Sequence, residues 1–317
     1  MNSVPVEFIE EILRNLRRET SSEIADDLSG LFGQIAADFK SSSFIVFFMI
    51  VPNKENGNFD YCAVKFQEGW DPEDPSTFEY YKLDRTDFRH IRYFILACEE
   101  EHIDGINEWT TVTAKDPIFQ RYLKACLRFP NLIGVHAPGT CNPSVVLKML
   151  PDHCTADDVC MVGGHSDVAD RLILKSLQCG RLRLLECDAF VKERSIEELI
   201  EIILKSKFFE LFWDFDSEEK SLLNELIGLW REKPEIFEFR KVIRGRCTLK
   251  HLRFSCDFKV AGYEKFIDGD KYQCFQLDHP SSQERRLVLA VHVSSTKFAT
   301  LEEAVKIEPI SYCFYIE

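Results

Sequence analysis

The chain has 317 residues, of which 45% are hydrophobic, 12% aromatic and 29% charged, and its formal net charge is −14 at pH 7. This composition is typical of a globular protein, and the length suits one large domain or two ordinary ones. Because phosphate backbones and anionic lipids repel an acidic chain, nucleic acid and membrane surfaces are excluded as expected partners.

The N-terminal segment and the cysteines both favour an intracellular protein. The chain begins Met-Asn-Ser-Val-Pro-Val-Glu, without the basic region and apolar run of a signal peptide. The apolar run from Phe44 to Val51 is far shorter than the roughly 20 residues that a membrane helix needs. The 12 cysteines are scattered and form no Cys-x-x-Cys pair, which favours reduced, buried thiols. We therefore expect a cytoplasmic protein, with the nucleus as the alternative compartment.

Residues 1–43 are expected to form a helical segment. A first helix is predicted over residues 4–16, because Pro5 suits the first helical position and an apolar stripe runs along one side. The stripe consists of Phe8, Ile9, Ile12, Leu13 and Leu16. A second helix is predicted from Ser22 to Phe39, weakened by its two glycines.

Residues 44–117 are expected to form a small α+β subdomain that begins with a β-meander. The turn pair Asn56-Gly57 indicates a hairpin between the first two of its strands. A helix is predicted from Thr86 or Asp87 to about Glu101, with Phe88, Ile91, Ile95 and Leu96 facing inward. The predicted strands are Phe44–Val51, Phe59–Phe66, Phe78–Leu83 and Trp109–Val112.

Residues 118–257 alternate amphipathic helices with short apolar strands, at steps of about 24 to 27 residues, which is the range of leucine-rich solenoid repeats. Apolar residues at consecutive positions are typical of parallel strands buried on both faces. We therefore predict an α/β fold, an irregular leucine-rich-like helix–strand solenoid with a parallel sheet. The alternative is an ordinary α/β domain. The helices are Ile118–Phe129, Ser144–Leu150, Asp167–Cys179, Ile196–Ser206 and Ser217–Lys233, and the strands Leu132–Val135, Val159–Val162, Leu182–Leu185, Phe208–Trp213 and Leu249–Phe254.

Residues 258–317 change character. The strands Tyr272–Leu277 and Leu287–Val293 are separated by a polar loop, His279–Arg286, which predicts an antiparallel β-hairpin that caps one end of the solenoid. A final strand is expected at Tyr312–Ile316.

With these elements in order, the chain resembles a nematode family of F-box and F-box-associated proteins. The resemblance rests on degenerate motifs: residues 1–13, the runs Phe78–Leu83 and Arg89–Phe94, Phe129-Pro130-Asn131-Leu132, and the terminal hairpin. In that family, a Val-Pro and the following helix dock on the Skp adaptor of a cullin-type ubiquitin ligase. The resemblance implies an F-box-like segment in residues 1–43, with adaptor-docking residues Val4, Pro5, Phe8, Ile12 and Leu13. The alternative is that this stripe packs on the protein's own core.

Motifs that carry chemistry are weak. The sequence contains none of the common phosphate-binding, dinucleotide-binding, serine-hydrolase or zinc-protease motifs. His153, Cys154, Cys160 and His165 have zinc-ligand chemistry, but their spacing matches no common zinc finger, and a buried thiol explains Cys160. A local group of basic residues predicts a solvated basic face or a docking surface for an acidic partner: Arg181, Arg183, Arg240, Lys241, Arg244 and Arg246.

These features favour a non-enzymatic protein-interaction scaffold that recruits substrates to a cullin-type ubiquitin ligase. Its expected partners are the Skp adaptor and a substrate protein, and no catalytic residue, cofactor or metal is assigned. The first alternative is a hydrolase or metal-dependent enzyme with a site near His136, Cys160 and His165. The second is a divergent structural or regulatory paralogue that does not bind the ligase.

Overall fold

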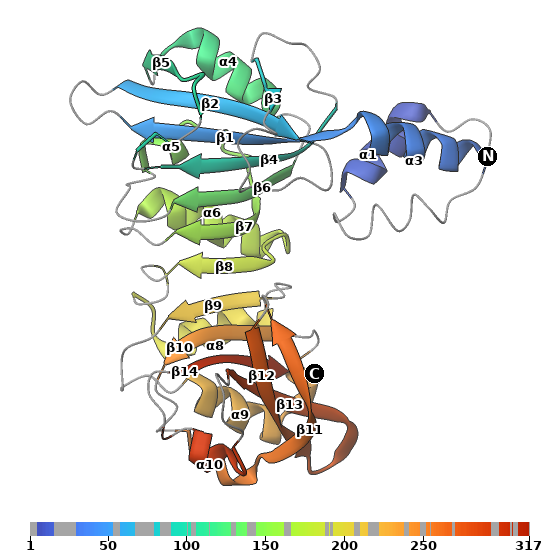
Figure 1. Ribbon diagram of the computed structural model, residues 1–317, viewed down its shortest axis with the longest axis vertical. Coiled ribbons are helices and arrows are strands. Elements are labelled where there is room, and N and C mark those ends of the chain that lie inside the picture. The colour runs from blue at the N-terminus through green and yellow to red at the C-terminus, as the bar shows by residue number, and fades with distance from the viewer. Residues whose placement is uncertain are drawn as a thin grey trace. The chain divides into compact units, whose positions relative to one another are not determined.

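A computed structural model gives the arrangement of the helices and strands (Figure 1). The described residues fall into two compact units, Met1–Ile173 and Leu174–Glu317, so the boundary lies inside the predicted repeat region. The structure describes residues 5–15, 30–52, 58–66, 79–82, 90–99, 101–102, 106–113, 115–127, 131–137, 144–161, 166–187, 190, 193–205, 210–214, 222–237, 241–247, 252–253, 255–267, 270–292, 298–304, 306 and 310–316.

The first unit begins with a helix pair, α1 (Val6–Asn15) and α3 (Gly30–Ser42). The carbonyl of Pro5 accepts hydrogen bonds from the amides of Phe8 and Ile9, so α1 begins directly after the proline. Ile9 and Leu13 are one helical turn apart and therefore share one side of α1. Both are buried in a small cluster with Ile35, Ala36 and Phe39 of α3. The two predicted N-terminal helices are confirmed over the described residues.

A mixed sheet forms the body of the first unit. Its strands lie in the order β3-β2-β1-β4-β6-β7, and β5 also pairs with β2. Strands β1, β4, β6 and β7 are parallel, whereas β2 is antiparallel to β1, β3 and β5. The strands are β1 (Phe44–Pro52), β2 (Asn58–Phe66), β3 (Glu79–Tyr80), β4 (Ile91–Cys98), β5 (Thr110–Thr113), β6 (Asn131–Ala137) and β7 (Ala156–Met161).

The predicted pairing of the first two strands is confirmed, although the turn residues Asn56 and Gly57 lie outside the described part of the chain. The helix predicted to end near Glu101 is wrong over Ile91–Cys98, which form β4. Ile91, Phe94, Leu96 and Cys98 are fully buried in this strand. A central strand that is buried on both faces is apolar at almost every position, so some of its residues also match the spacing of a helix.

The two faces of the parallel strands carry different residues. One row across the sheet joins Phe48, Leu96, Val135 and Val159, all fully buried. The next row joins Met49, Ala97, His136 and Cys160 and faces the opposite side, because successive residues of a strand alternate. In Figure 1, α5 (Ser144–Leu147) and α6 (Asp167–Gln178) lie on one side of β6 and β7, and none of the described helices covers the other side there.

The connection from β4 to β6 wraps around the edge of the sheet. Ile106 packs on one face, in a cluster with Ile45, Met49 and Cys62. The chain then forms β5 along the edge of β2 and continues into α4 (Pro117–Cys126). The Phe119 ring of α4 lies on the other face, 5.9 Å from the ring of Phe48. Asp116 caps α4 by accepting hydrogen bonds from the amides of Ile118 and Phe119.

The second unit combines a parallel and an antiparallel region. Its parallel strands β8 (Leu184–Cys187), β9 (Glu210–Asp214) and β10 (Lys241–Cys247) are separated by the helices α8 (Ile196–Lys205) and α9 (Leu222–Glu232). Beyond β10 follow, in space and all antiparallel, β14 (Ile310–Ile316), β13 (Ser282–His292), β12 (Asp270–His279) and β11 (Lys259–Ile267). The chain also forms the short helices η3 (Pro234–Ile236), η5 (Ser255–Asp257) and α10 (Leu301–Ala304).

The predicted α/β class, the parallel pairing of the central strands and the antiparallel hairpin β12–β13 are confirmed. Two details differ. The late strand predicted at Leu249–Phe254 is wrong at Leu252, which has no regular structure, and at Arg253, which lies in a turn, and the preceding segment forms β10 instead. The hairpin is part of an antiparallel sheet that joins β10 through β14, and the sequence analysis missed β11 altogether.

Lys241, assigned above to a solvated basic face, is buried and only 1% exposed. It pairs with Ile316 and shares a face of β10 with the buried Ile243. Burial lowers the pKa of the Lys241 ammonium from 10.5 to about 8. Lys241 therefore does not belong to the solvated basic face predicted from the sequence.

We predict that Lys241→Met changes how stability depends on pH. Between pH 8 and 10 the unfolded wild-type chain holds the Lys241 proton more tightly than the folded chain, so its free energy of unfolding rises with pH. The variant lacks this contribution. Between pH 7 and pH 10, the free energy of unfolding of wild type should rise by roughly 2 to 3 kcal/mol more than that of the variant, as measured by urea titrations under reducing conditions. Lys306→Met, at an exposed turn, is the control. Parallel pH profiles for wild type and Lys241→Met would contradict the assignment.

Candidate functional site

The first candidate surface is the outer side of α1. Pro5, Phe8 and Ile12 follow a spacing of three and four residues and therefore share one side of the helix. Phe8 is 57% exposed and Ile12 is 45% exposed, while Ile9 and Leu13 on the neighbouring stripe are buried against α3. We call Pro5, Phe8 and Ile12 the N-terminal apolar face. It is a compact apolar surface on a helix whose own packing requirement is already met.

The structure divides the predicted adaptor-docking residues. Pro5, Phe8 and Ile12 are exposed together, and Val4 lies outside the described residues. Leu13 is only 2% exposed and belongs to the cluster between α1 and α3. Its side chain stabilises the helix pair and is not available to a partner. Within the apolar stripe predicted from sequence, Ile9 and Leu13 pack on the protein itself, whereas Phe8 and Ile12 are exposed.

The second candidate surface is the side of β6 and β7 that the described helices leave open. His136 and Cys160, two residues of the predicted enzyme site, are direct neighbours on these strands. The His136 ring lies over Gly134, where a Cβ atom would come within 2.6 Å of Nε2. Asp158, which the sequence analysis did not single out, pairs with Gly134 and points to the same side. His165 lies outside the described residues.

Within the described part of the chain, no group of three or more His, Cys, Asp and Glu side chains is arranged to hold a metal ion. Cys154 is buried and His153 is exposed in the segment before β7. Among the described residues considered for an enzyme site, His136 and Cys160 are paired across β6 and β7.

The third candidate is a cavity at the edge of the first sheet. Along the same edge of β2, β3 pairs with Val64 and Lys65, and β5 pairs with residues 58–61. The amide of Tyr81 still donates to the carbonyl of Ala63, so the two edge pieces separate opposite Cys62. A cavity of about 550 Å³ opens at this break. We call it the aromatic cavity, and its lining includes Tyr61, Tyr80, Tyr81, Trp109 and Phe119, together with Cys62, Lys82, Glu108, Asp116 and Ile118.

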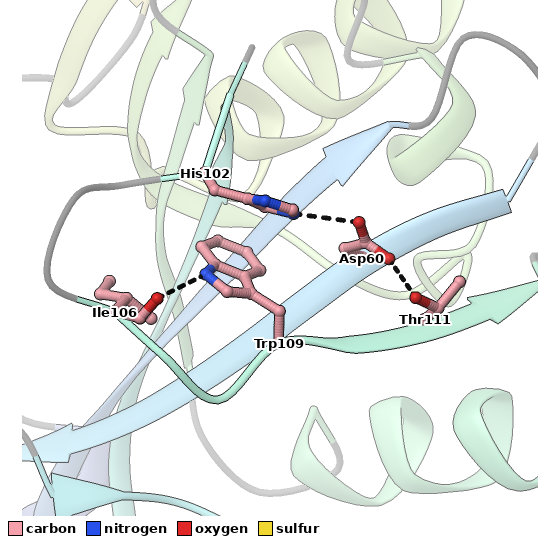
Figure 2. Close-up of polar contacts among 5 residues, drawn as sticks. All are labelled: Asp60, His102, Ile106, Trp109 and Thr111. Carbon is pink, nitrogen blue, oxygen red and sulfur yellow. Dashed lines mark hydrogen bonds and ion pairs between the residues drawn. The ribbon is translucent and has the colours of Figure 1, made fainter.

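A polar cluster fixes the chain beside this cavity (Figure 2). The Asp60 carboxylate contacts Nε2 of His102 at 3.0 Å and accepts a hydrogen bond from the hydroxyl of Thr111. The His102 ring contacts the Trp109 ring in a tilted arrangement, with the ring centroids 4.5 Å apart, and the Trp109 indole donates to the carbonyl of Ile106 at 2.9 Å. The amide of Asn107 donates to the hydroxyl of Tyr80. These contacts hold the segment before β5 against β2 and β3, which shapes the cavity wall.

The thiol in the cavity lining is buried and its pKa is raised. Cys62 is 2% exposed, and burial together with the nearby Glu108 carboxylate raises the pKa of its thiol to about 12. Because the thiolate is the reactive form, Cys62 stays protonated and unreactive near pH 7. The arrangement is suited to binding by shape, aromatic contact and charge.

Sequence reasoning missed this cavity. Asp60 is far from His102 and Trp109 in the chain, and they meet because the connection after β4 wraps around β2. The aromatic residues near β3 and β5 were visible in the sequence, but they were read as ordinary strand residues.

Comparison of the chain with protein-family models, curated proteins and solved structures finds no match. None of the described helices is long and apolar enough to cross a membrane. The N-terminal apolar face and the aromatic cavity are therefore interpreted from their own geometry.

We predict a wide difference in reactivity between two cysteines. Iodoacetamide at neutral pH should alkylate the exposed Cys179 well before Cys62, because Cys62 is buried and its thiol is protonated. Peptide mass spectrometry of timed samples measures both rates, and the same reaction in urea, where both thiols are accessible, is the control. Equal rates in the folded protein would show that Cys62 is open to reagent.

Proposed function

We propose that the chain is a non-enzymatic protein-interaction scaffold, and that α1 links it to the Skp adaptor of a cullin-type ubiquitin ligase. The observation that carries this proposal is the exposure of Phe8 and Ile12 on one side of α1. Large apolar side chains that cluster on an exposed surface are typical of protein-binding sites. The resemblance of residues 1–13 to an F-box supplies the identity of the partner.

The packing of the helix pair supports a separate role for this face. Ile9 and Leu13 already join α1 to α3, so the described structure does not need Phe8 or Ile12 for that contact. An amphipathic helix that presents an apolar side to a partner is a common mode of protein recognition. Docking would then use Pro5, Phe8 and Ile12, with Val4 as the preceding residue of the motif.

The remainder of the chain would recruit the substrate. We interpret the alternating helices and parallel strands as an irregular leucine-rich-like solenoid whose open side receives a substrate protein. In the first unit this side carries His136, Asp158 and Cys160, which are half-buried and offer polar contacts. The proposal places the protein in the cytoplasm or the nucleus, where the ligase and its substrates would meet it.

The experiment is a quantitative pull-down with purified Skp adaptor. We expect Phe8→Ala combined with Ile12→Ala to weaken adaptor binding about tenfold or more, because anchor residues each contribute about 1 kcal/mol or more to an interface. Phe266→Ala is the matched control, since Phe266 is 73% exposed on β11 in the second unit. Circular dichroism should show an unchanged helix content in the double variant.

Two outcomes would contradict this proposal. If the wild-type chain does not bind the adaptor, the ligase link fails, and a structural or regulatory role without ligase binding becomes the better account. If both the double variant and Phe266→Ala bind as well as wild type, binding does not use the N-terminal apolar face.

A second candidate function is a hydrolase or metal-dependent enzyme near His136, Cys160 and His165. The observation in its favour is that His136 and Cys160 are neighbours across β6 and β7. An imidazole and a thiol side by side are suitable zinc ligands or a base and nucleophile. Elemental analysis of the purified protein tests the metal version. Stoichiometric zinc that is lost in His136→Ala would support an enzyme or structural metal site, and its absence from the wild type would remove the metal version.

A further inference from the structure

The aromatic cavity has the chemistry of a site for a positively charged group. Its lining includes Tyr80, Tyr81 and Trp109, and its volume of about 550 Å³ lies within the usual range for ligand sites. The faces of aromatic rings carry negative electrostatic potential, so they attract cations. The same chain already places a cation on an aromatic ring nearby, with the Lys65 ammonium 5.5 Å from the Phe44 ring centroid.

The charged residues of the lining add to this preference. They are two carboxylates, Glu108 and Asp116, and one ammonium, Lys82. Asp116 is engaged as the N-cap of α4, because one of its oxygens accepts two amide hydrogen bonds. Glu108 lines the cavity, and its carboxylate lies close enough to Cys62 to raise the pKa of that thiol. Lys82 is exposed, so its charge is well solvated.

The wall that carries Trp109 is held in place. The indole nitrogen donates to Ile106, the ring contacts the ring of His102, and Asp60 joins His102 to Thr111 of β5 (Figure 2). Tyr80 is held from the other side by its hydrogen bond with the amide of Asn107. A preformed wall reduces the entropy that a ligand would otherwise lose in ordering the site. The net charge of −14 also favours the approach of a cationic partner.

We infer that the aromatic cavity binds the cationic end of an arginine or lysine side chain from a partner protein. The aromatic rings would contact the guanidinium or ammonium group, and Glu108 would neutralise its charge. This deepens the scaffold proposal by naming the group through which a substrate protein is recognised. It does not depend on the adaptor, because the cavity and the N-terminal apolar face use different residues.

The test is a titration of the full chain with small amino-acid probes, followed by the indole NMR signal of Trp109. The probes are N-acetyl-arginine amide, N-acetyl-trimethyllysine amide and the neutral N-acetyl-norleucine amide. We expect at least one cationic probe to bind about fivefold or more tightly than norleucine amide, since cation–π contact and charge pairing each add up to about 1 kcal/mol at exposed sites. The stronger of the two cationic probes identifies which side chain is recognised.

Substitutions locate the binding. Glu108→Gln should weaken the cationic probe about fivefold and leave the neutral probe unchanged, because only the charge contact is lost. Glu302→Gln removes one exposed carboxylate from α10 in the second unit and should leave all probes unaffected. Trp109→Leu should also abolish the cation preference, which calorimetric titration measures because this variant lacks the Trp109 signal, and thermal unfolding reports whether it still folds.

Three results would overturn the inference: no binding of either cationic probe, equal binding of norleucine amide, or unchanged binding in Glu108→Gln. Because no adaptor is present, each of these leaves the ligase proposal unaffected. Conversely, loss of adaptor binding in the Phe8→Ala, Ile12→Ala variant with intact probe binding would separate the two surfaces.

Discussion

The pairing of β1 with β4 is the constraint from which the first unit follows. The two strands are parallel, and the row from Phe48 through Leu96 to Val159 is buried across four strands. Parallel neighbours cannot be joined by a tight turn, so the chain must leave the sheet and return after each one. The return after β4 is the segment that wraps around β2 and covers both faces, with Ile106 on one and Phe119 on the other.

This wrapped connection also explains the aromatic cavity. The edge of β2 is completed by two short pieces from different parts of the chain, β3 and β5, rather than by one strand. Where the pieces separate, aromatic side chains that would pack inside a continuous sheet line an opening instead. The contacts of Asp60 with His102 and Thr111 keep the second piece in position. The break between β3 and β5 thus forms the cavity. The backbone of Ala63 beside it is still paired, because its carbonyl accepts a hydrogen bond from the amide of Tyr81.

Much of the fold could be predicted because local signals agreed with it. Helices α4 and α8 have clear N-terminal caps: Asp116 caps α4, and Ser195 and Glu198 bond reciprocally at the start of α8. Strand β4 was predicted as a helix because a run that is apolar at almost every position also matches helical spacing. Strand β10 was missed because Lys241, Arg244 and Arg246 suggest a solvated segment. For the site, the stripe on α1 was visible, but sequence cannot tell that Leu13 faces α3 while Phe8 faces outward. The meeting of Asp60 with His102 requires the tertiary path of the chain.

The proposed recruiting role requires two surfaces with separate supports. The N-terminal apolar face rests on the small cluster of Ile9, Leu13 and α3, whereas the aromatic cavity rests on the sheet cluster that contains Cys62 and Ile106. Because the two clusters share no residue, a change in one surface need not alter the stability of the other. An apolar helix face suits a constant partner, and an acidic aromatic cavity suits a basic side chain that different substrates could supply. Under the proposed function, the chemistry of each surface would therefore match a different half of the recruiting task.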